Sequence, residues 1–402
     1  MLFSLKVPYY KGMAKVMKIA AAVVPMPKPT LFTGEDSSLE LCQAISQLGY
    51  KKLLIVTDEV LVKIGLLDKI KERLSELNVA YVIYDGILPD PTFDQVYTGV
   101  DILRNNHCDS ILAVGGGSPI DASKAIAAQS TNNKPLEKLA GLFKLRKAPM
   151  PFFAIPTTAG TGSEVTIASV VSDPITHHKA FIIDPKLVPV MAALDGSMML
   201  GLPPSVTAAT GMDALTHAIE SFISVNATQE TDAFGLAATR LIMENLEIAV
   251  KDGKNLEARQ NMSMASYYAG AAFTKASVGY VHAIAHNFGA YYSTPHGIAN
   301  SIVLPHILDY SKESVINRLA QLAEVSGLRV GNETNAQLAD KFIAKIRSML
   351  KTFNIPEQLD TLKTDDIPKI AKSALEEAHN NYPVPKYMDQ KICESLLTKM
   401  VA

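Results

Sequence analysis

The chain has 402 residues, of which 48% are hydrophobic, and its 38 basic and 40 acidic side chains leave a net charge of −2. This composition excludes intrinsic disorder as a class. A net charge near zero gives no indication of a basic surface that would bind nucleic acid. The three cysteines are far apart and odd in number, so they fit neither a disulfide framework nor a CxxC metal site. They favour a reducing, cytoplasmic compartment.

Residues 1–29 are expected to form an extension ahead of the first domain. Its charged residues are Lys6, Lys11, Lys15, Lys18 and Lys28. No acid precedes Glu35, and the absence of arginine argues against a mitochondrial presequence. No apolar run approaches the ~20 residues that a membrane span needs, so we expect no membrane partner.

Residues 30–200 are predicted to form an α/β domain with a parallel, Rossmann-like sheet. Short β-branched runs cover residues 53–57, 80–84, 110–114 and 152–155. Helical patterns at 60–77 and 93–105 separate them, and this alternation is typical of βαβ units. Two later runs, 165–172 and 179–183, flank Asp173-Pro174 and predict a hairpin.

Residues 201–402 are predicted to form an all-α domain. The segment is rich in Ala, Leu, Glu and Met with a period of about 3.6 residues. The helical patterns cover residues 205–224, 231–250, 257–274, 313–325, 335–353 and 367–379.

A glycine-rich segment at 115–121, GGGSPID, follows the predicted strand 110–114. Its glycines let backbone amides approach a ligand, and the positive end of the following helix favours a phosphate. Ser118 is predicted as the N-cap and Pro119 as the first helical residue. The segment is neither GxGxxG nor a P-loop, and it is also typical of a plain strand-to-helix turn.

Two further segments follow predicted strands. A carboxylate at Asp58 can accept a hydrogen bond from a ribose 2′-hydroxyl and repel a 2′-phosphate, which favours NAD over NADP. The same side chain can instead cap the next helix. Residues 156–164, PTTAGTGSE, offer hydroxyl groups to a polar ligand, although a solvent-exposed loop has a similar composition.

Candidate metal ligands gather in the helical half. Asp213 and His217 are four residues apart, and so are His282 and His286, so each pair projects from one face of a helix. With His296, these residues offer oxygen and nitrogen donors for Fe²⁺, Zn²⁺ or another divalent ion. Five candidates exceed the usual ligand number, so one is expected to be surplus.

Together these blocks resemble the iron-containing (group III) alcohol dehydrogenases from about residue 30 to the C-terminus. The specific blocks are residues 115–121, 156–162, 211–220 and 282–305. The resemblance implies a dinucleotide-binding α/β domain, a helical domain of dehydroquinate synthase-like architecture, and a cleft between them. In this family the cleft holds NAD(P) and a divalent metal, with Fe²⁺ favoured here and Zn²⁺ as the alternative.

The resemblance also implies roles for individual residues. The metal ligands are the residues Asp213, His217, His282 and His296. His286 is then the surplus candidate, beside the nicotinamide, where it would relay a proton. The cofactor contacts are Asp58 for the adenosine ribose, Gly116, Gly117, Ser118 and Asp121 for the pyrophosphate, Thr157, Thr158 and Thr161 for the adenine or ribose side, Lys179 for the nicotinamide ribose, and Met198 for the adenine pocket.

The chain departs from the family at two positions. Ala168 stands where the lactaldehyde and propanediol branch has an asparagine near the substrate, so no 1,2-diol preference is expected. Asp90 replaces the asparagine common at its turn, which adds a charge.

The predicted function is metal-dependent hydride transfer between a small primary alcohol or aldehyde and NAD, in a homo-oligomer of two or more subunits. One alternative is an NAD- and metal-dependent lyase of dehydroquinate synthase type, although its substrate-binding Lys/Arg set is not evident near residues 279–306. The other is a non-catalytic scaffold that binds a nucleotide or a metal.

Overall fold

The structure is a computed structural model that describes residues 3–24, 26–174 and 179–402. The chain divides into two compact units. The α/β unit comprises Met26–Leu202 and Gly253–Tyr267, and the helical unit comprises Met1–Pro25, Pro203–Asp252 and Tyr268–Ala402.

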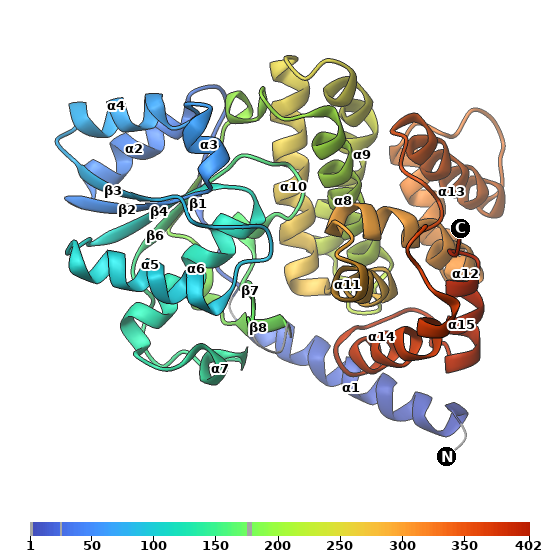
Figure 1. The fold of residues 1–402 in the computed structure, drawn as a ribbon. Helices are drawn as coiled ribbons and strands as arrows, with labels where there is room; N and C mark the ends of the chain where they lie inside the picture. Colours follow the sequence, from blue (N-terminus) through green and yellow to red (C-terminus); the bar gives the residue numbers. More distant parts are fainter. Residues whose placement is uncertain (1–2, 25, 175–178) are drawn as a thin grey trace. The chain divides into compact units, whose positions relative to one another are not determined.

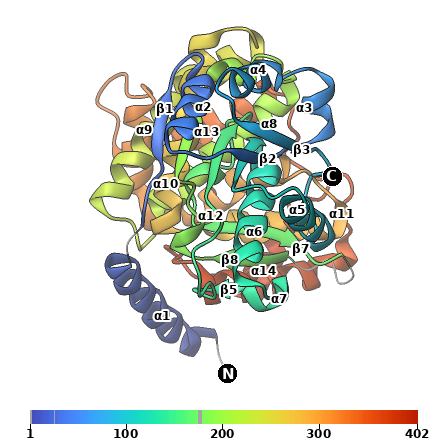
Figure 2. The ribbon, with the colours of Figure 1, turned by 90° about the vertical axis from the view of Figure 1, so that its left-hand side faces the viewer.

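The α/β unit is built on a six-stranded sheet in the order β1-β9-β6-β4-β2-β3, in which every neighbouring pair is parallel. Figure 2 shows the sheet from the side of this unit. Its strands are β1 (Thr30–Thr33), β2 (Lys52–Val56), β3 (Ala80–Tyr84), β4 (Ser110–Gly115), β6 (Phe152–Pro156) and β9 (Met191–Leu194). The parallel sheet and four of its strands were predicted, whereas β1 and β9 were not.

Helices cover both faces of this sheet (Figure 1). One face carries α2 (Ser37–Gln47) and α4 (Asp68–Glu76), and the other carries α5 (Phe93–Asn105) and α6 (Gly117–Asn132). In β2, Leu53 packs in the core on the first face and Leu54 in the core on the second. A strand buried on both sides reads as a continuous apolar run, which is why β2 was recognisable.

The predicted single helix over 60–77 is wrong. The structure has α3 (Glu59–Lys63) and α4, separated by a turn at Gly65. Gly65 has a φ of 72°, a left-handed conformation that ends a right-handed helix.

A smaller sheet completes the α/β unit, in the order β5-β8-β7. Its strands are β5 (Gly141–Leu142), β7 (Ala168–Ser172) and β8 (Lys179–Ile183). The antiparallel pairing of β7 with β8 confirms the predicted hairpin, although residues 175–178 of its connection lie outside the described residues. Shorter elements are α7 (Leu136–Leu139) and the 3-10 turns η1 (Ser163–Val165), η2 (Pro185–Leu187) and η3 (Gly196–Met199).

The segment Gly253–Tyr267 belongs to the α/β unit although it is distant in sequence. The Gln260 side chain donates from Nε2 to the Leu194 carbonyl, and its Oε1 accepts from the Gly196 N–H, both at 2.8 Å. Buried Arg259 donates to the carbonyl oxygens of Gly253 and Leu202. The Gln260 bonds satisfy backbone groups at the end of β9, and the Arg259 bonds satisfy carbonyl oxygens of the two residues at which this unit is interrupted, Leu202 and Gly253.

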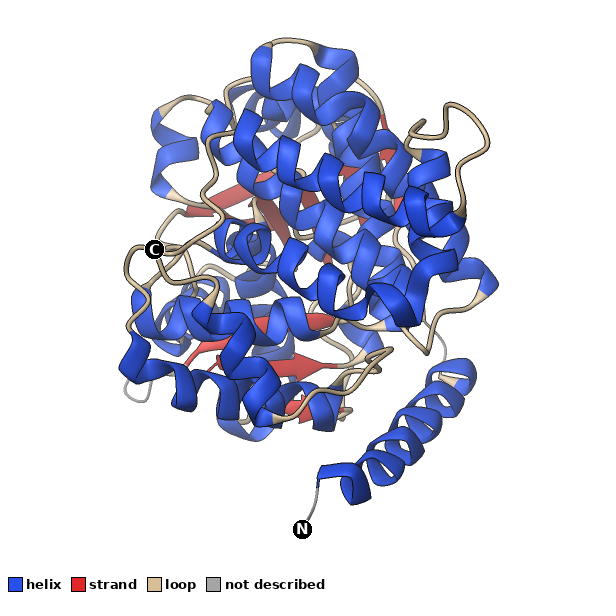
Figure 3. Cartoon of the chain, turned by 90° about the vertical axis from the view of Figure 1, so that its right-hand side faces the viewer, coloured by secondary structure: helices blue, strands red, loops and turns tan. Residues whose placement is uncertain are grey.

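Figure 3 shows the whole chain with its helices in blue. The helices of the helical unit are α8 (Pro204–Ile223), α9 (Gln229–Lys251), α11 (Tyr280–Tyr292), α12 (His296–Val325), α13 (Asn335–Thr352), α14 (Ile367–Asn381) and α15 (Gln390–Thr398), with the 3-10 turn η4 (Thr364–Asp366). A further helix, α10 (Leu256–Ala276), begins in the α/β unit and ends in this one. The predicted helix 313–325 is only the last part of α12, which is kinked at Val315.

The N-terminal segment forms a helix, α1 (Phe3–Val23), that packs on α14. The Tyr10 ring lies 4.6 Å from the His379 ring and 5.7 Å from that of Tyr387. Among the described residues, no helix is both long and apolar enough to cross a membrane.

Candidate functional site

Four predicted ligands come together in the helical unit. One donor atom from each of Asp213, His217, His282 and His296 lies within 4.8 Å of the others. The first two stand one turn apart on α8, while α11 and α12 supply the other two. A Cβ at Gly297 would lie 2.3 Å from the Ala209 carbonyl oxygen, so glycine lets the start of α12 approach α8.

The donor set suits a divalent cation. The Nε2 atoms of His217 and His282 lie 2.9 Å apart, and the His296 Nε2 lies 3.6 Å from the Asp213 Oδ1. Burial, and then the neighbouring His217, hold the pKa of His282 well below its usual value, so this imidazole is neutral and able to ligate. One carboxylate and three imidazoles fit Fe²⁺ or Zn²⁺.

Asn300 also reaches into this cluster. Its Nδ2 lies 2.6 Å from the Asp213 Oδ1, 3.2 Å from the His282 Nε2 and 3.1 Å from the His296 Nε2. Its buried Oδ1 has no hydrogen-bond partner among the described residues. Three acceptor atoms, one carboxylate oxygen and two imidazole nitrogens, therefore surround the amide nitrogen of Asn300. The same arrangement of acceptors would suit a cation. Sequence reasoning missed Asn300, although it stands four residues after His296.

A buried carboxylate orients one of the ligands. The Glu220 Oε2 lies 2.6 Å from the His282 Nδ1, and its Oε1 accepts the Val281 N–H at 2.8 Å. Burial raises the pKa of Glu220 to about 7. A proton on Nδ1 directs the Nε2 lone pair of His282 toward the cluster. Glu220 was not predicted, yet it is seven residues after Asp213 and so shares its helix face.

His286 lies outside the four-residue cluster but next to it. Its ring stacks on that of His296, with centroids 5.6 Å apart. Its Nδ1 lies 2.7 Å from the Glu377 Oε1, and the Tyr382 hydroxyl donates to the same oxygen at 2.5 Å. Burial, and then Glu377, hold the pKa of Tyr382 well above its usual value, so the phenol stays protonated. The carboxylate thus accepts two hydrogen bonds and keeps a proton on the His286 Nδ1.

The nucleotide-binding candidates follow three adjacent strands of the α/β unit. Asp58 follows β2, the glycine segment follows β4, and the threonine-rich segment follows β6. A Cβ at Gly117 would lie 2.7 Å from the Thr161 Cγ2, and one at Gly116 would lie 3.1 Å from the Thr158 Oγ1. The two loops therefore pack directly against each other at the carboxyl edge of the sheet, where open α/β sheets bind ligands.

The predicted start of α6 is two residues too late. Gly116, not Ser118, is the N-cap, and the helix begins at Gly117. The early start leaves Ser118 and Pro119 inside the first turn. The backbone amides of the glycines lie at the positive end of α6.

Asp121 already has two partners within the protein. Its carboxylate accepts hydrogen bonds from the Ser163 hydroxyl and the Val170 N–H, and burial raises its pKa. Lys124, one turn later and fully buried, donates to the carbonyl oxygens of Thr166 and Ala168. These contacts tie the first turns of α6 to the threonine-rich loop and to β7.

Asp58 caps the helix that follows it, as the alternative interpretation of this residue predicted. It is the N-cap of α3, with its Oδ1 accepting the Leu61 N–H at 3.0 Å. Its Oδ2 makes no hydrogen bond within the part of the chain that the structure describes. The cap and a ribose contact are compatible, because they use different oxygens.

Lys179 and Met198 differ in their surroundings. The Lys179 Nζ forms an ion pair with the Asp90 Oδ1 at 3.0 Å. Asp90 is the residue that replaces the family's asparagine, so its added negative charge is paired. Met198 is only 7% exposed and packs in the core between the sheet and α2.

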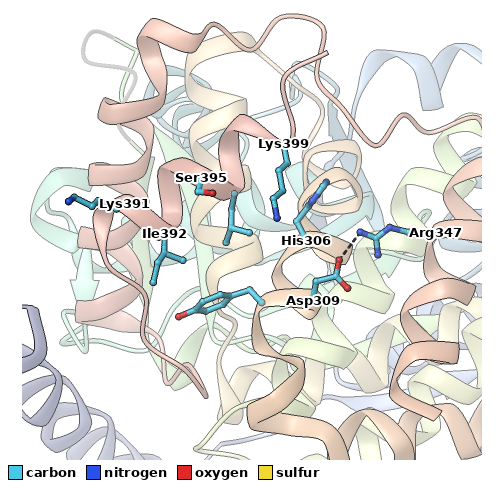
Figure 4. A pocket seen from close by; sticks show the side chains of 9 residues that line it. His306, Asp309, Arg347, Lys391, Ile392, Ser395 and Lys399 are labelled. Atoms are coloured by element: carbon cyan, nitrogen blue, oxygen red, sulfur yellow. Dashed lines mark hydrogen bonds and ion pairs between the residues drawn. The ribbon is translucent and has the colours of Figure 1, made fainter. Parts of the chain in front are cut away.

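A surface cavity of about 550 Å³ lies elsewhere in the helical unit. Figure 4 shows its lining residues, including His306 and the ion pair of Asp309 with Arg347 at 2.9 Å. None of them is a predicted site residue, and His306 lies outside the ligand cluster.

Comparisons with known proteins match nearly the whole chain. Residues 28–196 match the family described as iron-containing alcohol dehydrogenase, and residues 207–401 match the C-terminal part of the Fe-containing alcohol dehydrogenase family. Alcohol dehydrogenase 4 of Saccharomyces cerevisiae is 38% identical over 369 residues, or 90% of this chain and 95% of the relative. The NAD-dependent methanol dehydrogenase of Bacillus methanolicus is 37% identical over 351 residues, or 87% and 92%.

A solved structure agrees with these matches. The crystal structure of a 1,3-propanediol oxidoreductase superposes with a TM-score of 0.90 and 36% identity, covering 94% of this chain and 100% of the other. The predicted combination of a parallel α/β domain with a helical domain is confirmed. Because the family match begins at residue 28, α1 lies outside it.

Proposed function

Because the chain belongs to the family of iron-containing alcohol dehydrogenases, we propose that it transfers hydride between a small primary alcohol and NAD. The predicted family and the predicted oxidoreductase class are both confirmed by the family matches and by relatives named alcohol and methanol dehydrogenases. The observation that carries the proposal is the cluster of four ligand atoms within 4.8 Å, with the His286–Glu377 pair beside it.

We assign the divalent metal to Asp213, His217, His282 and His296. An ion held there supplies Lewis acidity toward the oxygen of the substrate. Fe²⁺ is the favoured ion and Zn²⁺ the alternative. Glu220 fixes the His282 ring through Nδ1, so that the nitrogen facing the ion needs no reorientation.

We assign the proton transfer to His286. Glu377 holds a proton on its Nδ1, which leaves Nε2 as the nitrogen that takes the alcohol proton as the substrate is oxidised. The charge that His286 then gains is balanced by the carboxylate 2.7 Å away. In the reverse direction the same imidazolium returns the proton to the product alcohol.

We assign NAD to the loops at the carboxyl edge of the sheet. Gly116, Gly117 and Ser118 offer backbone amides to the pyrophosphate at the start of α6. Asp58 offers to the adenosine ribose its Oδ2, the oxygen that does not cap α3. We assign Thr157, Thr158 and Thr161 to the adenine or ribose side of the cofactor. We assign Asp121 an indirect role, because its carboxylate holds Ser163 and Val170.

The remaining cofactor assignments rest on the family resemblance. Lys179 is proposed to contact the nicotinamide ribose, after exchanging its ion pair with Asp90 for the ligand. Met198 is proposed to support the adenine pocket from the core. NAD accepts the hydride when it is bound.

The substrate is proposed to be a small primary alcohol or its aldehyde. The names of the methanol dehydrogenase and of the 1,3-propanediol oxidoreductase support this size class. Ala168 has no side-chain amide that could bind the second hydroxyl of a 1,2-diol, so 1,2-diols should be poor substrates. We further propose that the protein is cytoplasmic, in keeping with its three free and buried cysteines, and that it forms a homo-oligomer.

A substrate panel tests the proposal. The purified protein is loaded with Fe²⁺ or Zn²⁺, mixed with NAD⁺ and a series of primary alcohols, and followed by the near-ultraviolet absorbance of NADH. Activity is expected with short primary alcohols and their aldehydes in reverse. No absorbance change with either metal in either direction would refute the proposal.

Glu377→Gln separates the proton relay from metal binding. The variant should keep its metal and lose ~10-fold or more in turnover, because glutamine cannot balance an imidazolium charge. Glu376→Gln, at the neighbouring exposed position, is the matched control and should turn over like the unmodified enzyme.

A further inference from the structure

The helix α1 has an inner face that packs on the helical unit. Phe3 and Tyr10 contact the ring of His379, with centroids 5.8 and 4.6 Å apart, and Ala14 is buried. These residues, together with partly buried Val7, recur at spacings of three and four. They form one stripe along the helix, and that stripe is already covered by protein.

A second apolar row lies on the outer side of α1. Its members are Leu5, Tyr9, Met13, Val16 and Ile19, and all of them are exposed. Leu5 is 63% exposed and Val16 is 60% exposed. At ~100° per residue this row lies roughly opposite the inner stripe, and it extends for ~20 Å. A monomeric soluble protein does not need such a row.

Lysines border the exposed row. At ~100° per residue, Lys6 lies beside the row on one edge and Lys15 on the other, whereas Lys11 and Lys18 lie closer to the inner stripe. Lys6, Lys11 and Lys15 have no ion-pair partner within the part of the chain that the structure describes, while the Lys18 Nζ donates to the Val225 carbonyl. Five of the 38 basic residues and none of the 40 acidic ones precede Glu35, so the rest of the chain carries a net charge of −7. The positive charge of the chain is therefore concentrated in the N-terminal segment that contains α1.

We propose that α1 docks the protein on the surface of an anionic lipid bilayer, with the apolar row in the interface and the lysines against the lipid headgroups. An interfacial helix needs an apolar face that enters the acyl boundary and basic residues that meet anionic lipids. Lysine stems can extend along the apolar row and place their ammonium groups in the headgroup layer. Tyr9 also suits this layer, since its ring is apolar and its hydroxyl polar.

This docking differs from membrane insertion. The sequence-based expectation of no membrane partner depended on the lack of an apolar run long enough to span a bilayer, and no described helix could do so. A helix that lies on the surface needs no such run. The family match starts at residue 28, so the catalytic fold does not account for α1.

A second copy of α1 is a poorer partner for the row. Pairing two such helices would bring lysines together, and no acidic side chain occurs within residues 1–34 to compensate them. Repulsion between like charges therefore disfavours a dimer through α1, whereas an anionic surface turns the same charges into attraction.

Vesicle flotation of the full-length holoenzyme tests the proposal. Vesicles of phosphatidylcholine with ~30% phosphatidylglycerol should carry the protein upward, whereas vesicles of phosphatidylcholine alone should not. Binding should fall steeply at ~0.5 M salt, where screening acts within ~4 Å. Lys6→Gln/Lys11→Gln/Lys15→Gln should weaken binding to the anionic vesicles by ~100-fold.

Leu5→Gln/Val16→Gln tests the apolar row. Glutamine preserves the helix, and the loss of two apolar side chains should weaken binding ~10-fold or more without changing turnover in solution. Ile248→Gln/Val330→Gln is the matched control, because it removes two exposed apolar side chains elsewhere in the helical unit and should bind like the unmodified protein.

Several outcomes would overturn the proposal. These are failure of the unmodified protein to float with anionic vesicles, equal binding to neutral ones, and unchanged binding of Leu5→Gln/Val16→Gln. A fall in oligomeric mass on that double substitution, measured by light scattering, would instead assign the row to an interface between copies.

Discussion

Replacing Glu220 by glutamine should weaken metal binding, although Glu220 touches no metal. The site needs two acceptor oxygens from this residue, one for the His282 Nδ1 at 2.6 Å and one for the Val281 N–H at 2.8 Å. Glutamine has a single acceptor oxygen and an amide that only donates. Whichever way the amide turns, one of the two donors loses its partner.

The magnitude follows from the hydrogen bond that is lost. A bond to a charged, buried group contributes about 1.5–3 kcal/mol, which corresponds to roughly 10–150-fold in an equilibrium constant. Removing the outer partner of a metal-binding histidine typically costs about 10–100-fold in affinity. If the amide faces Nδ1, the His282 proton must move to Nε2, where it blocks the metal. We therefore expect the Kd for Zn²⁺ to rise by ~10–100-fold.

The assay is a competition for Zn²⁺ between the metal-free protein and a chromophoric chelator at about pH 8, above the raised pKa of Glu220. Zn²⁺ avoids the oxidation that complicates Fe²⁺. Glu244→Gln is the control, because Glu244 forms an exposed ion pair with Arg240 on α9 and should not affect the Kd. Circular dichroism verifies that both variants fold.

A folded Glu220→Gln variant with a Zn²⁺ Kd within about twofold of the unmodified protein would refute this reasoning. Glu220 would then act only as an acceptor for the first turn of α11, and the orientation of His282 would have another cause.

Other substitutions test further parts of the molecule. His282→Ala should lose metal by elemental analysis, whereas His286→Ala should retain it and lose turnover; equal metal loss would contradict their separate roles. Asp58→Gly should raise kcat/KM with NADP relative to NAD, and an unchanged ratio would leave this carboxylate only its capping role. Gly297→Ala should destabilise the protein by about 1–3 kcal/mol, because its Cβ would lie 2.3 Å from a backbone carbonyl oxygen of α8; an unaltered melting temperature would contradict this. Burial lowers the pKa of His379 from 6.5 to about 4, so its neutral form favours folding above pH 6.5 and this stability is lost as the pH falls through 4. His379→Gln should reduce this acid dependence in thermal melts, and an identical pH profile would exclude the histidine as its source.

The parallel sheet was predictable where burial on both faces leaves a continuous apolar run, as in β2. β1 and β9 were missed because each has only four residues, too few to show a strand pattern. The two strands pair with one another in the sheet, and this pairing could not be recognised from the sequence. The break at Gly65 lies inside an amphipathic pattern that continues on both sides of it. Periodicity alone therefore predicts one helix where a left-handed residue makes two.

In the candidate site, local spacing made some residues predictable from the sequence and left others undetected. Asp213 with His217, and His282 with His286, were visible because an i, i+4 spacing is local. Separating the ligands from His286 required the family resemblance. The partner of His286 could not be found by spacing, because Glu377 is 91 residues away and reaches it from α14.

The discontinuity of the α/β unit affects how the chain can fold during synthesis. Gln260 satisfies the Leu194 carbonyl and the Gly196 N–H, but it is made 64 residues after Gly196. A ribosome adding ~5–20 residues per second exposes those backbone groups for several seconds before their partner emerges. Meanwhile the sequences of α8 and α9 leave the tunnel with their apolar faces uncovered. A fragment ending at Leu202 should therefore be a poor stand-alone nucleotide-binding domain, and nascent chains paused near residue 250 should be good chaperone substrates.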